Sequence, residues 1–304
     1  MTTSIAGTTE APVTRAGERG PGRWIDDFDP EDAAFWEKTG RGIARRNLMW
    51  SIVAEHLGFS VWLLWSIVAV HLNDAGFAFT DDQLFWLVAI PSLVGATLRL
   101  PYTFAVPRFG GRNWTVVSAL LLVIPATGLA WAVSNPGTPF WAMLLVAATA
   151  GVGGGNFASS MANISYFFPE KEKGWALGLN AAGGNIGVAV VQAPIVVSAL
   201  IVAGGGLHLA RAGLMWIPLA VLAAVAAWRY MDNLTHATNE KRAMRDVLRD
   251  RNTAIISFLY VGTFGSFIGF GFAFGQVLQV QFKPDFPTPI SAAYLTFLGR
   301  CSVR

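Results

Sequence analysis

The chain has 304 residues, of which 53% are hydrophobic and only 13% are charged, and its mean hydropathy is +0.46. A soluble domain is about one quarter charged, so this composition excludes an ordinary soluble protein and favours an integral membrane protein. The formal net charge of +3 carries little information by itself, whereas the positions of the charges carry more.

The first segment, residues 1–45, is rich in Thr, Gly, Pro and charged side chains. This composition predicts a disordered tail. No apolar signal-peptide segment precedes the first long apolar run, so no cleaved signal is expected. The single cysteine, Cys301, indicates neither a disulfide framework nor a metal site.

Seven apolar runs are long enough to cross a bilayer as helices, which takes about 20 residues. They cover residues 47–71, 84–106, 113–133, 139–167, 174–203, 212–231 and 253–280. An eighth run begins near residue 289 and stops at Gly299, so we expect the chain to end partway through an element. The predicted fold class is an all-α membrane protein.

Basic residues between these runs lie mostly on one side of the expected membrane. That side carries Lys38, Arg41, Arg45, Arg46, Arg108, Arg112, Lys171, Lys173, Arg229, Lys241, Arg242, Arg245, Arg249 and Arg251. The other side carries only Arg211 and Lys283. Because cytoplasmic loops are enriched in Lys and Arg, the N-terminus is predicted to be cytoplasmic.

A polar, helix-prone loop over residues 233–252 follows the sixth run, where two six-helix halves of a transporter would join. The predicted organisation is a cytoplasmic tail over 1–45, a six-helix half over 46–232, this connecting loop, and a partial second half over 253–304.

Small residues form stripes in spans four and five. The relevant segments read GVGGGNFASSMANISYFFP (151–169) and GWALGLNAAGGNIGVAVVQ (174–192). The stripes contain Gly151, Gly155, Ser159 and Asn163 on span four, and Gly183 and Gly187 on span five. Such stripes let helix backbones approach closely, so helix packing is their simplest interpretation.

Four asparagines lie in the same two spans: Asn156, Asn163, Asn180 and Asn185. A side-chain amide at membrane depth needs hydrogen-bond partners, so it faces the bundle interior or a wet cavity. Its NH2 group can donate to an oxygen of an anion.

Arg99 lies inside the second apolar run, in the stretch VGATLRLPYTF, with no acid near it in sequence. It could snorkel, because Arg108 at the helix end is roughly 13 Å away at helical rise. It could pair with Glu55, the only acid deep in span one. It could also bind an anion, which would offset its charge. The residues alone leave these alternatives open.

The segment GGGNFASSMANISYFFPEKEKGWALGLNAAGGNIGV (153–188) resembles the signature of the nitrate/nitrite porters, the NarK-type branch of the major facilitator superfamily. GATLRLPYTF and FGSFIGFGFAF resemble that family's second and seventh spans, and the resemblance covers about 45–299. The loop PRFGGR (107–112) is similar to a superfamily motif, although Pro107 stands where an Asp is usual. The resemblance implies a major-facilitator-type bundle with a complete six-helix N-terminal half and the start of the second half.

The resemblance also implies site residues. Arg99 would grip nitrate, and Gly154 would allow close backbone approach. Phe157, Asn185, Tyr260 and Phe264 would line the same site. Glu55 and His56 would not contact the anion directly but would hold the site residues in place or have a structural role, and His56 is a candidate proton carrier. Ala181 falls where the family often has a glycine, which would narrow the pocket slightly.

The implied function is secondary transport of nitrate, nitrite or both across the cytoplasmic (inner) membrane by alternating access, as in nitrate assimilation. In the family the anion lies between two arginines, one from each half. The second would fall beyond Arg304, so this chain is expected to transport poorly or not at all. The alternative is a non-transporting fragment, or a half-transporter that needs a separately encoded C-terminal half.

Exchange of nitrate for nitrite and proton–nitrate symport both remain open, and exchange, an antiporter mode that needs no proton carrier, is slightly favoured. The expected partners are the two anions and the lipid bilayer, with protons as a further candidate and no nucleic acid. The sequence contains no H-E-x-x-H motif, no nucleophile paired with His and Asp, and no Cys/His cluster. We therefore expect no enzyme activity, no cofactor and no metal.

Overall fold

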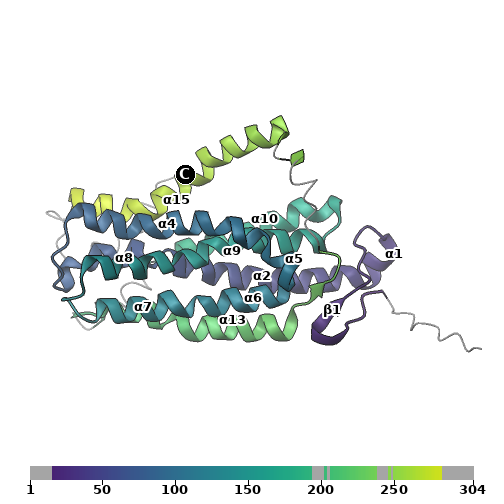
Figure 1. The fold of residues 1–304 in the computed structure, drawn as a ribbon, viewed down its shortest axis with the longest axis horizontal. Helices are drawn as coiled ribbons and strands as arrows, with labels where there is room; N and C mark the ends of the chain where they lie inside the picture. Colours follow the sequence, from purple (N-terminus) through teal and green to yellow (C-terminus); the bar gives the residue numbers. More distant parts are fainter. Residues whose placement is uncertain (1–15, 194–201, 204–205, 238–245, 248, 283–304) are drawn as a thin grey trace, which may run out of the picture.

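The computed structural model describes residues 16–193, 202–203, 206–237, 246–247 and 249–282. Figure 1 shows an elongated bundle whose helices run mostly along its long axis. Seven helical stretches among the described residues are long and apolar enough to cross a membrane. They are Ala33–His71, Asp81–Thr103, Gly111–Val133, Phe140–Phe167, Glu170–Val191, Leu209–Tyr230 and Arg251–Ala273. We number them spans one to seven.

Several spans consist of two helices in series. Span one contains α1 (Ala33–Phe35), a π-helical turn (Trp36–Gly40), α2 (Arg41–Trp62), α3 (Leu64–Val68) and a 3-10 turn (Ala69–His71), and another 3-10 turn (Asn73–Ala75) follows it. Spans two and three contain α4 (Asp81–Thr103), followed by the short α5 (Ala105–Phe109), then α6 (Gly111–Leu121) and α7 (Val123–Val133). The remaining spans contain α8 (Phe140–Thr149), α9 (Gly151–Phe167), α10 (Glu170–Val191), α12 (Leu209–Leu214), α13 (Trp216–Tyr230) and α15 (Arg251–Phe282).

The predicted all-α membrane fold is confirmed, and the span boundaries agree with the sequence except in two places. Span one begins before residue 47, because α2 already starts at Arg41. Span five was expected to reach residue 203, but α10 ends at Val191, shortly before Pro194. A proline cannot donate the next helical hydrogen bond. Residues Val202–Ala203 instead form strand β2, which pairs antiparallel with β3 (Gly206–Leu207). The expected eighth run lies outside the described residues.

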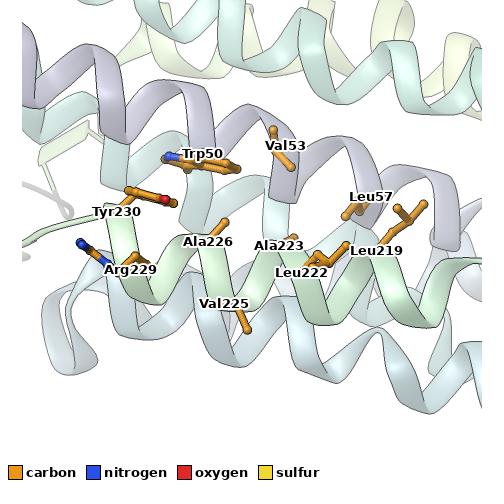
Figure 2. A pocket seen from close by; sticks show the side chains of 10 residues that line it. All are labelled: Trp50, Val53, Leu57, Leu219, Leu222, Ala223, Val225, Ala226, Arg229 and Tyr230. Carbon is orange, nitrogen blue, oxygen red and sulfur yellow. The ribbon is translucent and has the colours of Figure 1, made fainter.

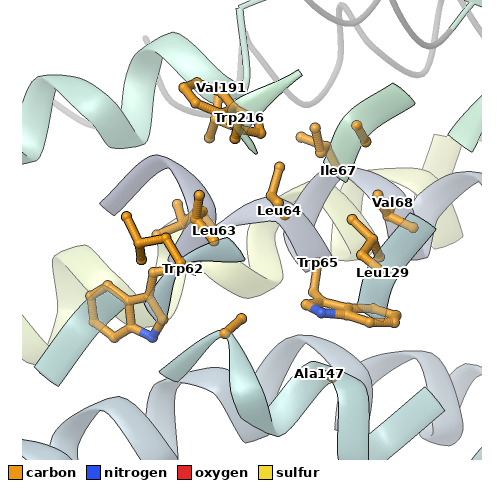
Figure 3. Packing of buried hydrophobic residues seen from close by; sticks show 14 of the residues in the cluster. Trp62, Leu63, Leu64, Trp65, Ile67, Val68, Leu129, Ala147, Val191 and Trp216 are labelled. Atoms are coloured by element: carbon orange, nitrogen blue, oxygen red, sulfur yellow. The ribbon is translucent and has the colours of Figure 1, made fainter. Parts of the chain in front are cut away.

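Span one is the centre of the bundle. Figure 3 shows residues 62–68 surrounded by Leu129, Ala147, Val191 and Trp216, which come from spans three, four, five and six. In an apolar 18-residue stretch of span one, 83% of the stretch is buried inside the protein, whereas the corresponding share in span seven is only 17%. Close packing of these side chains supplies the contacts that hold spanning helices together.

Residues 16–45, expected to be a disordered tail, form ordered elements at one end of the bundle (Figure 1). A 3-10 turn (Pro21–Arg23) precedes β1 (Trp24–Ile25), which pairs parallel with β4 (Asn233–Leu234) just after span six. The segment's apolar side chains are buried in a second hydrophobic cluster. That cluster includes Ile25, Phe28, Phe35, Trp36, Phe167, Phe168 and Leu234. These few apolar residues anchor a segment whose average composition is polar.

A single carboxylate joins this N-terminal segment to the end of span six. The Asp232 side chain is fully buried and forms ion pairs with Arg19 at 2.7 Å, Arg23 at 2.7 Å and Arg46 at 2.5 Å. The Asn47 amide also donates to it at 3.2 Å. Burial alone would raise the pKa of Asp232, but the hydrogen bonds and charges of Arg19 and Arg46 outweigh burial and hold that pKa below its ordinary value. We call these five residues the Asp232 cluster.

Candidate functional site

Arg99 lies on α4, and a capping box of Thr80 and Gln83 stabilises the N-terminus of this helix. Its guanidinium points between helices: Nε donates to the backbone oxygen of Gly154 on α9 at 3.3 Å. Its terminal carbon lies 4.9 Å from the ring centre of Phe157 and 5.1 Å from that of Phe264. The group therefore lies inside the bundle among rings from spans four and seven, and does not snorkel to the helix end.

The rings around Arg99 form a continuous stack. Phe59 on span one stacks on Phe157 with centres 5.8 Å apart, and Phe157 stacks on Phe264 at the same separation. Phe264 in turn stacks on Tyr260 at 4.9 Å. The side chain of Tyr260 also interacts with the guanidinium. Rings facing a cation attract it through their negative π-faces.

Two ring residues of span one were not found from the sequence. Phe59 belongs to the stack, and the Trp62 ring centre lies 5.9 Å from the Arg99 guanidinium. Trp62 Nε1 donates to the backbone oxygen of Pro91 at 2.7 Å, which fixes the indole against α4. Glu55, Phe59 and Trp62 are spaced by four and three residues, so they share one helix face. That spacing was a usable signal.

Glycines give the site its close helix contacts. A Cβ on Gly95 would lie only 2.9 Å from Trp62 Nε1, and a Cβ on Gly154 would also collide with the Trp62 indole. A Cβ on Gly151 or Gly155 would collide with α4, and one on Gly183 or Gly187 would collide with α2. The stripes therefore face neighbouring helices, and Gly154 leaves room for the indole beside Arg99.

Glu55 on α2 is fully buried, and its side chain packs against α9 and α10. Asn156 Nδ2 donates to its Oε2 at 3.3 Å, and the Ser160 side chain lies beside the carboxyl group. Asn180 Nδ2 donates to Ser160 Oγ at 2.7 Å. Arg99 and Glu55 interact electrostatically, but within the described residues they are not among the ion pairs closer than 4.0 Å. The structure therefore does not favour Glu55 as the counter-charge of Arg99.

Three other residues singled out from the sequence lie on α9, α2 and α10. Asn163 is buried against Gly111 at the junction of α9 and α6. Nδ1 of His56 lies 3.3 Å from the backbone oxygen of Gly183. Asn185 on α10 has a buried Oδ1 that finds no hydrogen-bond partner among the described residues. Its amide can rotate to present an N–H donor instead, so it remains a group with spare hydrogen-bonding capacity.

Fold and site together define a multi-pass membrane protein that holds a cationic, ring-lined site between its spans. The Major Facilitator Superfamily profile matches residues 51–302, and the chain belongs to that superfamily.

The chain is similar to three proteins that are named as nitrate/nitrite transporters or antiporters. It is 45% identical to the nitrate/nitrite transporter NarU of Salmonella typhimurium, over 94% of this chain and 64% of the relative. It is also 45% identical to NarU of Escherichia coli, over 90% of this chain and 61% of the relative. It is 37% identical to the probable nitrate/nitrite antiporter NarK2 of Thermus thermophilus, over 90% of this chain and 65% of the relative. The chain thus spans less than two thirds of the length of these relatives.

Proposed function

We propose that the protein belongs to a secondary transport system that moves nitrate, nitrite or both across the cytoplasmic membrane by alternating access. The observation that carries this proposal is the Arg99 guanidinium, which lies at membrane depth against Phe157 and Phe264 without a close carboxylate among the described residues. The names of the similar transporters support the choice of anion.

The chemistry of an arginine suits a small planar anion. A guanidinium is flat, stays charged at any relevant pH, and carries donors in a rigid fork that matches two oxygens at once. Nitrate is flat and singly charged, so one arginine can neutralise it. Phe157 and Phe264, whose ring centres are 5.8 Å apart, place flat ring faces beside the guanidinium, and flat faces suit a planar anion. A tetrahedral dianion such as sulfate fits neither this shape nor this charge.

Exchange of nitrate for nitrite is the mode we favour over proton symport. Symport needs a titratable group that reaches the path. Glu55 is fully buried and hydrogen-bonded to Asn156, and His56 contacts the Gly183 backbone, so both groups are engaged with neighbouring helices. The test is whether nitrate uptake by a full-length relative changes the pH of the medium. A stoichiometric alkalinisation would establish symport.

The N-terminus is proposed to be cytoplasmic, on the basis of the one-sided Lys and Arg distribution. In a Cys301→Ser background, a reagent that cannot cross membranes should label Pro136→Cys, in the loop between spans three and four, in intact cells. It should not label Lys171→Cys, in the first turn of span five, until the cells are opened. The reverse pattern would overturn the orientation.

Nitrate binding to the purified chain tests the proposed site directly. Arg99→Lys keeps the charge but loses the planar fork, so we expect about tenfold weaker nitrate binding from the loss of one charge-assisted hydrogen bond. Arg99→Ala should abolish measurable binding. The matched control is Arg108→Lys, because Arg108 is exposed and lies on α5, beyond the end of α4. This variant should bind nitrate like the unmodified chain. Unchanged nitrate affinity in Arg99→Ala would refute the proposal.

A further inference from the structure

A groove of about 420 Å³ lies between α2 and α13, away from the rings that face Arg99 (Figure 2). Its walls are apolar along most of its length, with Val53 and Leu57 on α2 facing Leu219 and Leu222 on α13. In Figure 1 α13 lies on the opposite side of the bundle from α15, and α15 packs against α3 and α4. The groove is open to the surroundings, since Leu222 is 63% exposed.

One end of the groove is polar. Trp50 and Tyr230 stack there with ring centres 5.2 Å apart and planes 9° from parallel. The guanidinium carbon of Arg229 lies 5.5 Å from the Tyr230 ring centre. Among the described residues Arg229 is in none of the ion pairs, and the nearby Asp232 is already paired with three other arginines. Arg229 therefore has positive charge available for a ligand.

The length of the groove matches one half of a bilayer. From Leu219 to Tyr230 the helix rises about 16 Å, and half of a typical hydrocarbon core is about 15 Å. Trp and Tyr favour the depth where the hydrocarbon meets the headgroups, and an arginine just beyond them meets the phosphates. The groove is thus about as long as one acyl chain, and its cationic end lies at the depth of the lipid headgroups.

We propose that this groove is a binding site for an anionic phospholipid of the cytoplasmic leaflet. One acyl chain lies between α2 and α13, the glycerol region contacts the Trp50 and Tyr230 rings, and the phosphate contacts Arg229. The site is separate from Arg99 and does not depend on which anion the protein transports. An anionic lipid is specified, rather than any lipid, because the charge at the end of the groove needs a negative partner.

Native mass spectrometry of the purified chain, titrated with phosphatidylglycerol or with phosphatidylcholine in non-ionic detergent, tests this site. We expect one phosphatidylglycerol to bind in preference to phosphatidylcholine. Arg229→Gln should weaken phosphatidylglycerol binding about fivefold, the effect of one basic residue at a membrane surface, and leave phosphatidylcholine unchanged. Leu222→Trp, which fills the groove, should weaken binding of both lipids.

Each variant has a matched control elsewhere on the protein. Arg108 is also exposed and lies over the ring of the next residue, Phe109, at 5.8 Å, so Arg108→Gln should leave lipid binding unchanged. Leu145, on α8, is 61% exposed, much like Leu222, so Leu145→Trp is the apolar control. Equal losses in Arg229→Gln and Arg108→Gln, or full phosphatidylglycerol binding in Leu222→Trp, would show that lipid coats the surface without a specific site and would overturn the proposal.

Discussion

Two charged side chains of opposite sign, the buried Asp232 and the partly buried Arg99, differ in the partners that surround them. Asp232, just after span six, is fully buried and paired with Arg19, Arg23 and Arg46. Arg99, at membrane depth, meets aromatic rings and a backbone oxygen, but no carboxylate closer than 4.0 Å among the described residues.

We interpret this difference as one between a structural charge, Asp232, and the proposed ligand-binding charge, Arg99. A buried carboxylate with several fixed partners stabilises one arrangement of the chain, and here it joins the N-terminal segment, span one and the end of span six. A partly buried cation at membrane depth without a close carboxylate is unfavourable until a mobile anion supplies the missing charge. The two sites therefore predict opposite responses to removal of their charge.

The largest expected effect is at Asp232. Asp232→Asn keeps the shape but leaves three arginines facing a neutral amide. Because those arginines are partly exposed, we expect a loss of about 3 kcal/mol in unfolding free energy, the lower end for breaking a buried ion pair. The measurement is denaturant unfolding of the purified chain in detergent. Nitrate affinity should be unchanged, since the Asp232 cluster lies at the end of the bundle.

Acid titration gives a second readout of the same cluster. The pKa of Asp232 is lower in the folded protein than its ordinary value of 3.8. The ion pairs therefore contribute fully above pH 3.8, and their contribution is lost as the pH falls through the lowered pKa. The unmodified chain and Asp232→Asn should converge in stability under strong acid. Asp246→Asn, at an exposed position, is the control; an equal loss there would show that the cluster has no special role.

The next effect has the opposite sign. Arg99→Leu removes an uncompensated charge and its ring contacts, and we expect a net gain of about 1–2 kcal/mol in stability without anion. Saturating nitrate should stabilise the unmodified chain, because a ligand that binds only the folded state shifts unfolding. It should not stabilise Arg99→Leu. If Arg99→Leu is destabilised as strongly as Asp232→Asn, Arg99 is a structural charge and the comparison fails.

The sequence was sufficient for the spans and for most of the Arg99 site. Apolar runs of about 20 residues mark spanning helices, and Arg99 stands out because a charge at that depth is rare. The resemblance indicated Phe157 and Phe264, which the structure brings to the guanidinium. Phe59 and Trp62 were missed because an aromatic residue in an apolar helix becomes informative only once its helix face is considered, and the face that they share with Glu55 was not considered.

The Asp232 cluster could not be predicted, for a different reason. Its partners Arg19 and Arg23 are more than 200 residues away in sequence. Local composition treats them as solvated charges in a polar tail, and only the pairing of β1 with β4 brings them to Asp232. Long-range ion pairs in short irregular segments leave no periodic pattern in the sequence. Residues 16–45 were therefore expected to be disordered because their average composition is polar.

The smallest effect we expect is at Gly154, and it sharpens the comparison by leaving the charge of Arg99 in place. In Gly154→Ala the new methyl collides with the Trp62 indole, so the indole must shift, and we expect its contact with the guanidinium to be lost. Loss of one cation–ring contact, about 0.5–1 kcal/mol, should weaken nitrate binding by roughly two- to fivefold. Gly178→Ala on α10, where a Cβ meets nothing within 4 Å, is the control and should bind nitrate normally. Equal nitrate affinity in both variants would mean that the rings do not position the guanidinium and that charge alone determines binding.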